Sequence, residues 1–260
     1  MDEATLGITV RYLGGPTALL EIGGGRLLTD PTFDPVGDYP IGSRALQKTM
    51  PSPITPEDVG HLDAVLLSHD QHPDNLDEGG REFLAAVPLV LSTAEARARL
   101  GGSVLALDNW TDVELPLPDG RSIQVTGVPA RHGPPGCETL TGAVTGFVVT
   151  GDHAPTVYIS GDNAALELVQ EIANRFGTVD AALLFAGAAR TPLLDGAFLT
   201  LTSAEAAEAA AILGARHIVP LHFEGWAHFT QGRDTLIEAF EQASLTDRLH
   251  LLDPGEQIAL

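Results

Sequence analysis

The hydrophobic pattern of the first third of the chain predicts strands rather than helices. Apolar, β-rich runs cover residues 8–13, 17–22 and 26–29, and glycine-rich breaks separate them. Short runs of this kind between glycine turns are typical of a β-meander. Residues 30–56 lose the pattern and are rich in Pro, Gly and Asp. We therefore expect a structureless loop there that borders a functional site as a mobile cover.

The remaining chain repeats strand and helix patterns in two similar halves. A short apolar run at residues 64–67 predicts a buried strand that is followed directly by the polar sequence SHDQHPDNLD. Further strands are expected over residues 88–92, 122–128, 143–150, 156–160, 181–185, 217–221 and 249–252. Helices are expected over residues 78–86, 94–100, 164–176, 203–213 and 234–243, with Ser203 as an N-cap. This pattern predicts two packed sheets with helices outside, a layered α/β architecture in one domain spanning residues 1–260.

Charge and composition narrow the class of partner. The 260 residues include 35 acidic and 14 basic ones, a formal net charge of −21, and such a surface repels nucleic acids and anionic membranes. The only lysine is Lys48, and the other basic residues are arginines, whose side chains can form paired hydrogen bonds with a carboxylate or phosphate. An anionic small-molecule substrate therefore remains a possibility. The lone Cys137 excludes an internal disulfide and an all-thiolate zinc site. Without a basic leader or an apolar run of about 18 residues, we expect a cytoplasmic protein, and a homo-oligomer remains open.

Histidine and aspartate gather where predicted strands end. Four strand ends each deliver potential ligands into a Gly- or Pro-rich loop, and these ends meet if the strands lie side by side. The candidates are His69, Asp70, His72, Asp74, His132, Asp162 and His222. A single histidine at a strand end more often packs or meets solvent than binds a metal. Their recurrence favours a divalent metal site, with Zn expected first and Mn or Fe as alternatives.

The sequence resembles the metallo-β-lactamase fold hydrolases in four segments that occur in the family order: SHDQHPDNLD, VPARH, YISGD and VPLH. The opening GGPTALLEIGGGRLLTDP suits the first meander of that family, and the resemblance covers essentially the whole chain. It is nearest to the branch of the ascorbate-phosphate lactonases and the N-acylphosphatidylethanolamine phospholipases. It implies a four-layer αβ/βα sandwich with one or two metals between the sheets. It also implies a metal-bound hydroxide that attacks a lactone, ester, amide or phosphodiester.

The first motif departs from the family pattern His-x-His-x-Asp-His. Anchoring the motif on Ser68 makes His69 the first ligand and Gln71 an insertion, whereas anchoring it on the His-Pro-Asp run places Asp70 first. We favour His69, because a strand that ends at Ser68 aims the next side chain into the site. By resemblance, the first metal would be held by His69, His72, His132 and Asp162. The second would be held by Asp74, Asp162 and His222. In either register Asn75 stands where relatives have a third histidine, so we expect weaker binding of the second metal.

Residues outside the ligand set are weaker candidates. His228 lies in the segment HFEGWAHF, where the chain can turn back over the site. It is a candidate general acid or substrate contact, and a histidine at such a position has a packing or surface role equally often. Trp226 is more often a core anchor than a substrate platform. Arg131 is more often solvated than an anion clamp. Glu224 lies in the same segment as His228, and Cys137 has no base beside it.

Two classes of function compete. A metal-dependent hydrolase acting on a small substrate is the first hypothesis, with Asp74 orienting or deprotonating the attacking water and His228 as the second catalytic candidate. A non-catalytic metal- or ligand-binding protein on the same scaffold is the alternative, since Asn75 and the altered spacing can leave a site that binds without turnover. Iron-dependent redox chemistry is a third hypothesis, and it needs more carboxylate ligands than the sequence offers.

Overall fold

Seven strands form the first sheet of the computed structural model, which describes residues 7–260. In sheet order they are β15 (Gln257–Ala259), β1 (Ile8–Gly14), β2 (Thr17–Ile22), β3 (Gly25–Thr29), β6 (Ala64–Leu66), β7 (Val90–Ser92) and β8 (Val104–Ala106). The strands from β15 to β3 pair antiparallel, and β3, β6, β7 and β8 pair in parallel. The expected N-terminal meander is therefore confirmed.

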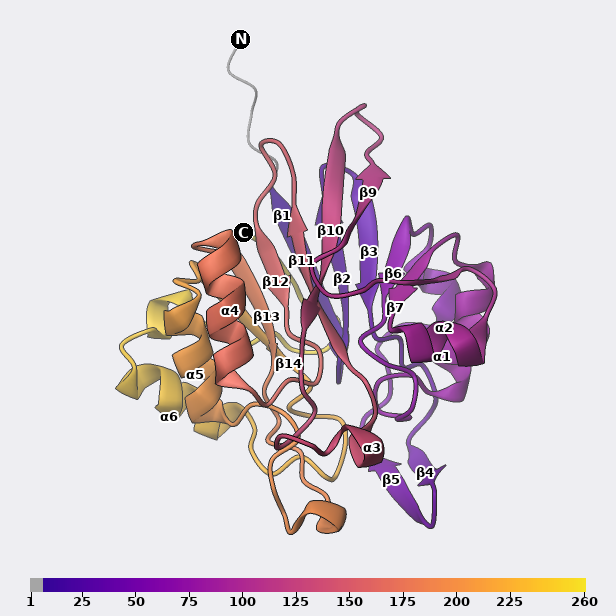
Figure 1. The fold of residues 1–260 in the computed structure, drawn as a ribbon, viewed down its shortest axis with the longest axis vertical. Helices are drawn as coiled ribbons and strands as arrows, with labels where there is room; N and C mark the ends of the chain where they lie inside the picture. The colour runs from indigo at the N-terminus through magenta and orange to yellow at the C-terminus, as the bar shows by residue number, and fades with distance from the viewer. Residues whose placement is uncertain (1–6) are drawn as a thin grey trace.

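Six strands form the second sheet. In sheet order they are β14 (His217–Leu221), β13 (Ala181–Phe185), β12 (Val157–Ile159), β11 (Thr145–Thr150), β10 (Ser122–Pro129) and β9 (Asp112–Pro116). The strands from β9 to β12 pair antiparallel, whereas β12, β13 and β14 pair in parallel. The parallel strands of both sheets run toward the same edge of the molecule, which is the lower edge in Figure 1.

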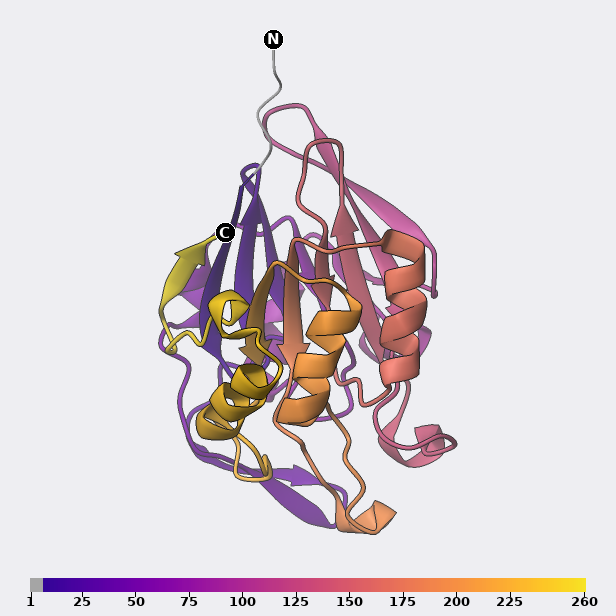
Figure 2. The ribbon, with the colours of Figure 1, turned by 90° about the vertical axis from the view of Figure 1, so that its left-hand side faces the viewer.

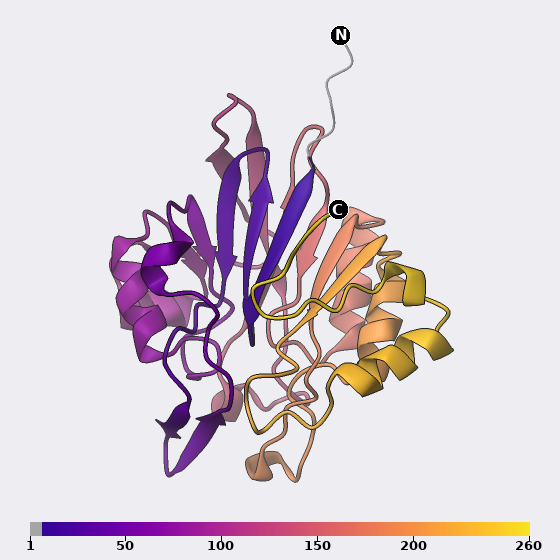
Figure 3. The same cartoon turned by 180° about the vertical axis from the view of Figure 1, so that it is seen from behind.

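Helices cover the outer face of each sheet (Figures 1 and 2). The first sheet carries α1 (Glu78–Phe83) and α2 (Ala94–Leu100), and the second carries α4 (Leu166–Phe176), α5 (Ser203–Ile212) and α6 (Arg233–Gln242). The view from behind shows the two sheets between the two groups of helices (Figure 3). This is the four-layer αβ/βα sandwich that the sequence predicts, and among residues 7–260 no helix has both the length and the apolar composition needed to cross a membrane.

Strand residues alternate between an apolar core that lies between the sheets and a second apolar cluster on the outer face of each sheet, which makes three clusters in all. In β13, Leu183 and Phe185 face the core between the sheets, whereas Ala182 and Leu184 face the helices. The first sheet alternates in the same way, with Leu20 between the sheets and Leu19 on the outer side. Both faces are buried, so the central strands are continuous apolar runs, as expected for parallel strands between layers.

Three sequence predictions were wrong. Residues 249–252 do not form a strand, because Leu249 makes only an isolated bridge to Ile218. The N-cap of α5 is Thr202 and not Ser203, since the Thr202 hydroxyl accepts from the backbone N–H of Glu205, whose carboxylate accepts in return. The segment at residues 30–56 is not structureless.

That segment contains a β-hairpin of β4 (Gly37–Ile41) and β5 (Arg44–Lys48), followed by a 3₁₀ turn at Pro56–Val59. The base of the hairpin is fixed to the loop after β14, because Thr49 N–H donates to the Gly225 carbonyl and Ala227 N–H donates to Gln47. Lys48 is buried there and pairs with Asp77 at 3.0 Å. The hairpin borders the lower edge of the sandwich (Figure 1), and its proposed mobility stays a prediction.

Candidate metal centre

The loop after β6 supplies the first two imidazoles of the site. His69 is fully buried, with Nδ1 2.9 Å from the Ser68 hydroxyl and Nε2 2.9 Å from Nδ1 of His72. Burial lowers the pKa of His69 well below its usual range, and it lowers the pKa of His72 to about 4. Both rings are therefore neutral at pH 7, the state in which imidazole binds a metal.

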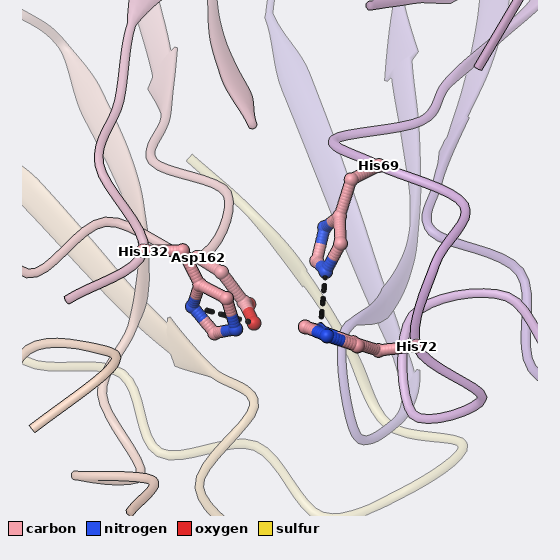
Figure 4. A group of neighbouring side chains, drawn as sticks. All are labelled: His69, His72, His132 and Asp162. Carbon is pink, nitrogen blue, oxygen red and sulfur yellow. Dashed lines mark hydrogen bonds and ion pairs between the residues drawn. The ribbon is translucent and has the colours of Figure 1, made fainter. Parts of the chain in front are cut away.

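Two loops of the second sheet complete a first group of four side chains. His132 follows β10, and its Nδ1 lies 2.8 Å from the Leu199 carbonyl, a contact that orients the ring. Asp162 follows β12, and its Oδ2 lies 3.4 Å from the same nitrogen. His69, His72, His132 and Asp162 each offer a ligand atom within 4.8 Å of the others. Figure 4 shows the rings of His69 and His72 on one side and His132 and Asp162 on the other, all directed toward a shared centre.

Gly161 allows the two halves of the site to meet. Its φ is +56°, and a Cβ atom there would lie 2.7 Å from the Thr145 carbonyl oxygen and 2.8 Å from Cβ of Ser68. Any side chain would therefore push the loop that carries Asp162 away from the loop that carries His69.

A second group consists of Asp74, Asp162 and His222, whose ligand atoms also lie within 4.8 Å of one another. Nδ1 of His222 lies 2.8 Å from Oδ1 of Asp162, and Nε2 lies 3.3 Å from Oδ2 of Asp74. Burial lowers the pKa of His222, but the two carboxylates outweigh burial and raise that pKa to about 10. The backbone of His222 has φ of +54°, a conformation that non-glycine residues adopt mainly where the surrounding structure enforces it.

Unsatisfied polar atoms mark the space between these side chains. Oδ1 of Asp74, Oδ2 of Asp162 and Nε2 of His222 are buried and form no hydrogen bond, although the last two atoms have longer ion-pair contacts at 3.4 and 3.3 Å. Buried polar atoms without partners are rare, since each loses the hydration it had in the unfolded chain. A divalent cation accepts electron pairs from all of them, so the donor set fits a metal.

Asn75 faces this centre through its amide nitrogen. Nδ2 lies 3.1 Å from Oδ1 of Asp162 and 3.1 Å from Oδ2 of Asp30, so the amide donates to both carboxylates. Asp30 also accepts from the backbone N–H and the hydroxyl of Ser68. Burial raises the pKa of Asp30 to about 7 despite these bonds. Asp30 and Ser68 were absent from the predicted site, although the opening segment that resembles the family ends on Asp30 and Pro31.

The structure distinguishes the two candidates for the first ligand position, His69 and Asp70. The Asp70 carboxylate pairs with the guanidinium of Arg99, and Arg81 donates to its carbonyl. Gln71 turns toward the Ala143 carbonyl. His69 is therefore in the cluster and Asp70 is outside it, as the first register predicts.

Of the weaker candidates, His228 borders the site and the others lie outside it or support it. Nε2 of His228 lies 3.0 Å from Oδ2 of Asp74, so this histidine borders the second group. Glu224 pairs with Arg233, and Arg131 pairs with Glu167, which keeps both outside the site. Trp226 is buried and packs in a T-shaped contact with Tyr39. Cys137 is buried and donates to the His132 carbonyl at 3.3 Å, so it supports a loop of the site.

Comparisons with known proteins agree with this fold. A metal-dependent hydrolase of Rubrobacter xylanophilus is 29% identical over 274 residues, covering 99% of both chains. The crystal structure of an isothiocyanate hydrolase from Delia radicum gut bacteria superposes with a TM-score of 0.79 at 23% identity, covering 96% of this chain and 98% of that one.

A possible metal-dependent hydrolase of Veillonella parvula also superposes with a TM-score of 0.79, at 18% identity and over 99% and 100% of the two chains. At these identities the two solved structures support the fold alone. The model of the beta-lactamase superfamily domain matches residues 25–223, which is most of the chain. The protein therefore belongs to the beta-lactamase superfamily and has the metallo-β-lactamase fold.

Proposed function

We propose that the protein is a metal-dependent hydrolase of a small lactone, ester or phosphodiester. One observation carries this proposal: two groups of potential ligands share Asp162, and members of both groups line one cavity. His72, Asp74, His132 and His228 all line that cavity, so a substrate that enters it meets both groups. The full-length similarity to curated metal-dependent hydrolases supports the same activity.

Zinc is the ion that the first group suits best, because three imidazoles and one carboxylate match its usual ligands, with Mn or Fe as alternatives. The second group has two carboxylates and one imidazole, so we propose that it binds its ion less tightly. A bound divalent ion would lower the pKa of its water and polarise the substrate oxygen.

Asp74 and His228 are the proposed catalytic residues of the chain. Burial raises the pKa of the Asp74 carboxyl, but His228 and His222 outweigh burial and hold that pKa well below its usual range. Asp74 therefore stays ionised, and as a carboxylate it can orient a water through a hydrogen bond. His228 contacts Asp74 and lines the cavity, and these two contacts support its proposed role as the proton donor to the leaving group.

Metal analysis and a substrate panel test this proposal together. Purified protein is analysed for metal content per chain and assayed on a lactone, a phosphodiester and a β-lactam, before and after chelation. We expect turnover that chelation abolishes and that Zn or Mn restores. Full activity after verified metal removal would exclude a metal-dependent reaction. A firmly held metal without turnover on any substrate would favour the non-catalytic binding protein.

A further inference from the structure

The cavity beside the metal centre has apolar sides. The β4–β5 hairpin contributes Ile41 and Leu46, and the segment after β13 contributes Leu194 and Leu199. Leu140 and Leu193 stand at the rim with exposures of 57% and 60%. These two are half of the exposed large hydrophobic residues found between residues 7 and 260, and both lie at this one opening.

Two arginines stand among these apolar residues. Arg44 on β5 donates to the Thr191 hydroxyl at 3.0 Å, and the guanidinium of Arg190 lies 4.0 Å from the ring centroid of Phe198. Both partners are neutral, and no described carboxylate forms an ion pair with either arginine. Both guanidinium groups are thus oriented without being neutralised.

The charge pattern of this opening is unusual for the chain. The protein carries 35 acidic residues against 14 basic ones, yet within residues 7–260 the candidate ligand Asp74 is the only acidic residue that lines the cavity. Arg44 also lines the larger outer cleft, which shares His72 and Leu140 with the cavity and carries Glu95 and Glu138 beside Arg44 and Arg99. Inside the cavity itself, a ligand that reaches the metal centre meets apolar walls and two arginines that have no ion-pair partner among the described residues.

We propose that the substrate has a short apolar chain with an anionic group at its far end, and that Arg44 and Arg190 bind this group. The inference rests on the proposed hydrolase activity and narrows its substrate class. The apolar chain would occupy the space between Ile41, Leu46 and Leu199, with the reacting carbonyl at the metal centre. Guanidinium groups form paired hydrogen bonds with both carboxylate and phosphate, so both are tested as the anionic group.

Matched nitrophenyl esters test the inference in the metal-loaded protein. The probes are the neutral 4-nitrophenyl pentanoate, the carboxylate-ended 4-nitrophenyl glutarate monoester and the phosphonate-ended 4-nitrophenyl 4-phosphonobutanoate. We expect kcat/KM for at least one anionic ester to exceed that for the neutral ester by about tenfold, as one charge-assisted hydrogen bond provides. The better of the two anionic esters identifies the group.

Arginine variants assign the effect to these residues. Arg44→Gln and Arg190→Gln should each lower the ratio of kcat/KM for the preferred anionic ester to that for the neutral ester about threefold, and the double variant should remove the tenfold preference. Arg97→Gln is the matched control, because Arg97 is exposed on α2 and lines neither opening. Equal turnover of neutral and anionic esters, or equal losses on both in the variants, would overturn the inference while leaving the hydrolase activity intact.

Calorimetry keeps the inference testable if no ester is cleaved, an outcome that counts against the proposed function itself. Glutarate and pentanoate both carry one carboxylate able to reach the metal, and only glutarate carries a second. The unmodified protein should bind glutarate about tenfold more tightly, and Arg44→Gln with Arg190→Gln should remove the difference. Equal binding of the two acids would refute recognition of the anionic end.

Discussion

Replacing Asn75 by histidine restores the third histidine of the family motif and removes two hydrogen bonds at once. In the native chain the amide nitrogen donates to Asp30 and to the shared carboxylate of Asp162, each at 3.1 Å. A hydrogen bond to a charged group contributes about 1.5–3 kcal/mol, so losing both costs about 3–6 kcal/mol in the metal-free protein. A new imidazole beside the second group can offset that loss only when an ion binds it.

The expected shift in melting temperature follows from this cost. For a chain of about 250 residues, 1 kcal/mol corresponds to roughly 2 °C. Metal-free Asn75→His should therefore melt about 6–12 °C below the metal-free native protein. Asn174→His is a suitable control, because Asn174 is exposed on α4 and the same change there should shift the transition by less than about 1 °C.

Metal titration provides the second half of this assay. We expect the native protein to hold one ion tightly, and Asn75→His to raise occupancy toward two while recovering part of its thermal stability. Scanning calorimetry and elemental analysis on the same samples measure both. Two tight ions in the native protein would show that Asn75 does not weaken the second group. A metal-free variant as stable as the native protein would refute the role of the two hydrogen bonds.

Three further predictions use other parts of the site. His132→Ala should lose metal while keeping its fold, measured by elemental analysis and circular dichroism against the exposed control His61→Ala; unchanged metal content would contradict the assignment. Ion binding at the second group should release about one proton at pH 7 and should become tighter as pH rises. The pKa of His222 in the metal-free protein is raised to about 10, so this ring must lose a proton to bind an ion, whereas His72, with a pKa of about 4, is already neutral. Calorimetry in two buffers of different ionisation enthalpy measures the number of protons released. Lys48→Met should lower the free energy of unfolding by about 3 kcal/mol and expose the hairpin to limited proteolysis. The change removes the cation from the buried carboxylate of Asp77, which keeps only its hydrogen bonds from backbone N–H groups.

Most of the sandwich could be predicted because its strands are buried on both faces. The ranges 17–22, 181–185 and 217–221 agree with β2, β13 and β14 at both ends, since continuous apolar runs between turn residues leave little choice of boundary. The β4–β5 hairpin escaped prediction because most of its residues are exposed or half-buried and carry no hydrophobic period. Its position depends on backbone bonds to residues nearly 180 positions away, which a local pattern cannot contain.

The first ligand position shows why the site was less predictable than the fold. His69 and Asp70 both have side chains that bind divalent ions, and both follow the end of β6, so their chemistry left two registers open. The deciding contact is the pairing of Asp70 with Arg99, which lies 29 positions later on α2. That pairing neutralises the carboxylate and turns it away from the cluster, while Ser68 orients His69 inward. To identify the ligand in this loop, one must know which of the candidate side chains is paired with another group. That pairing depends on how α2 packs against the sheet.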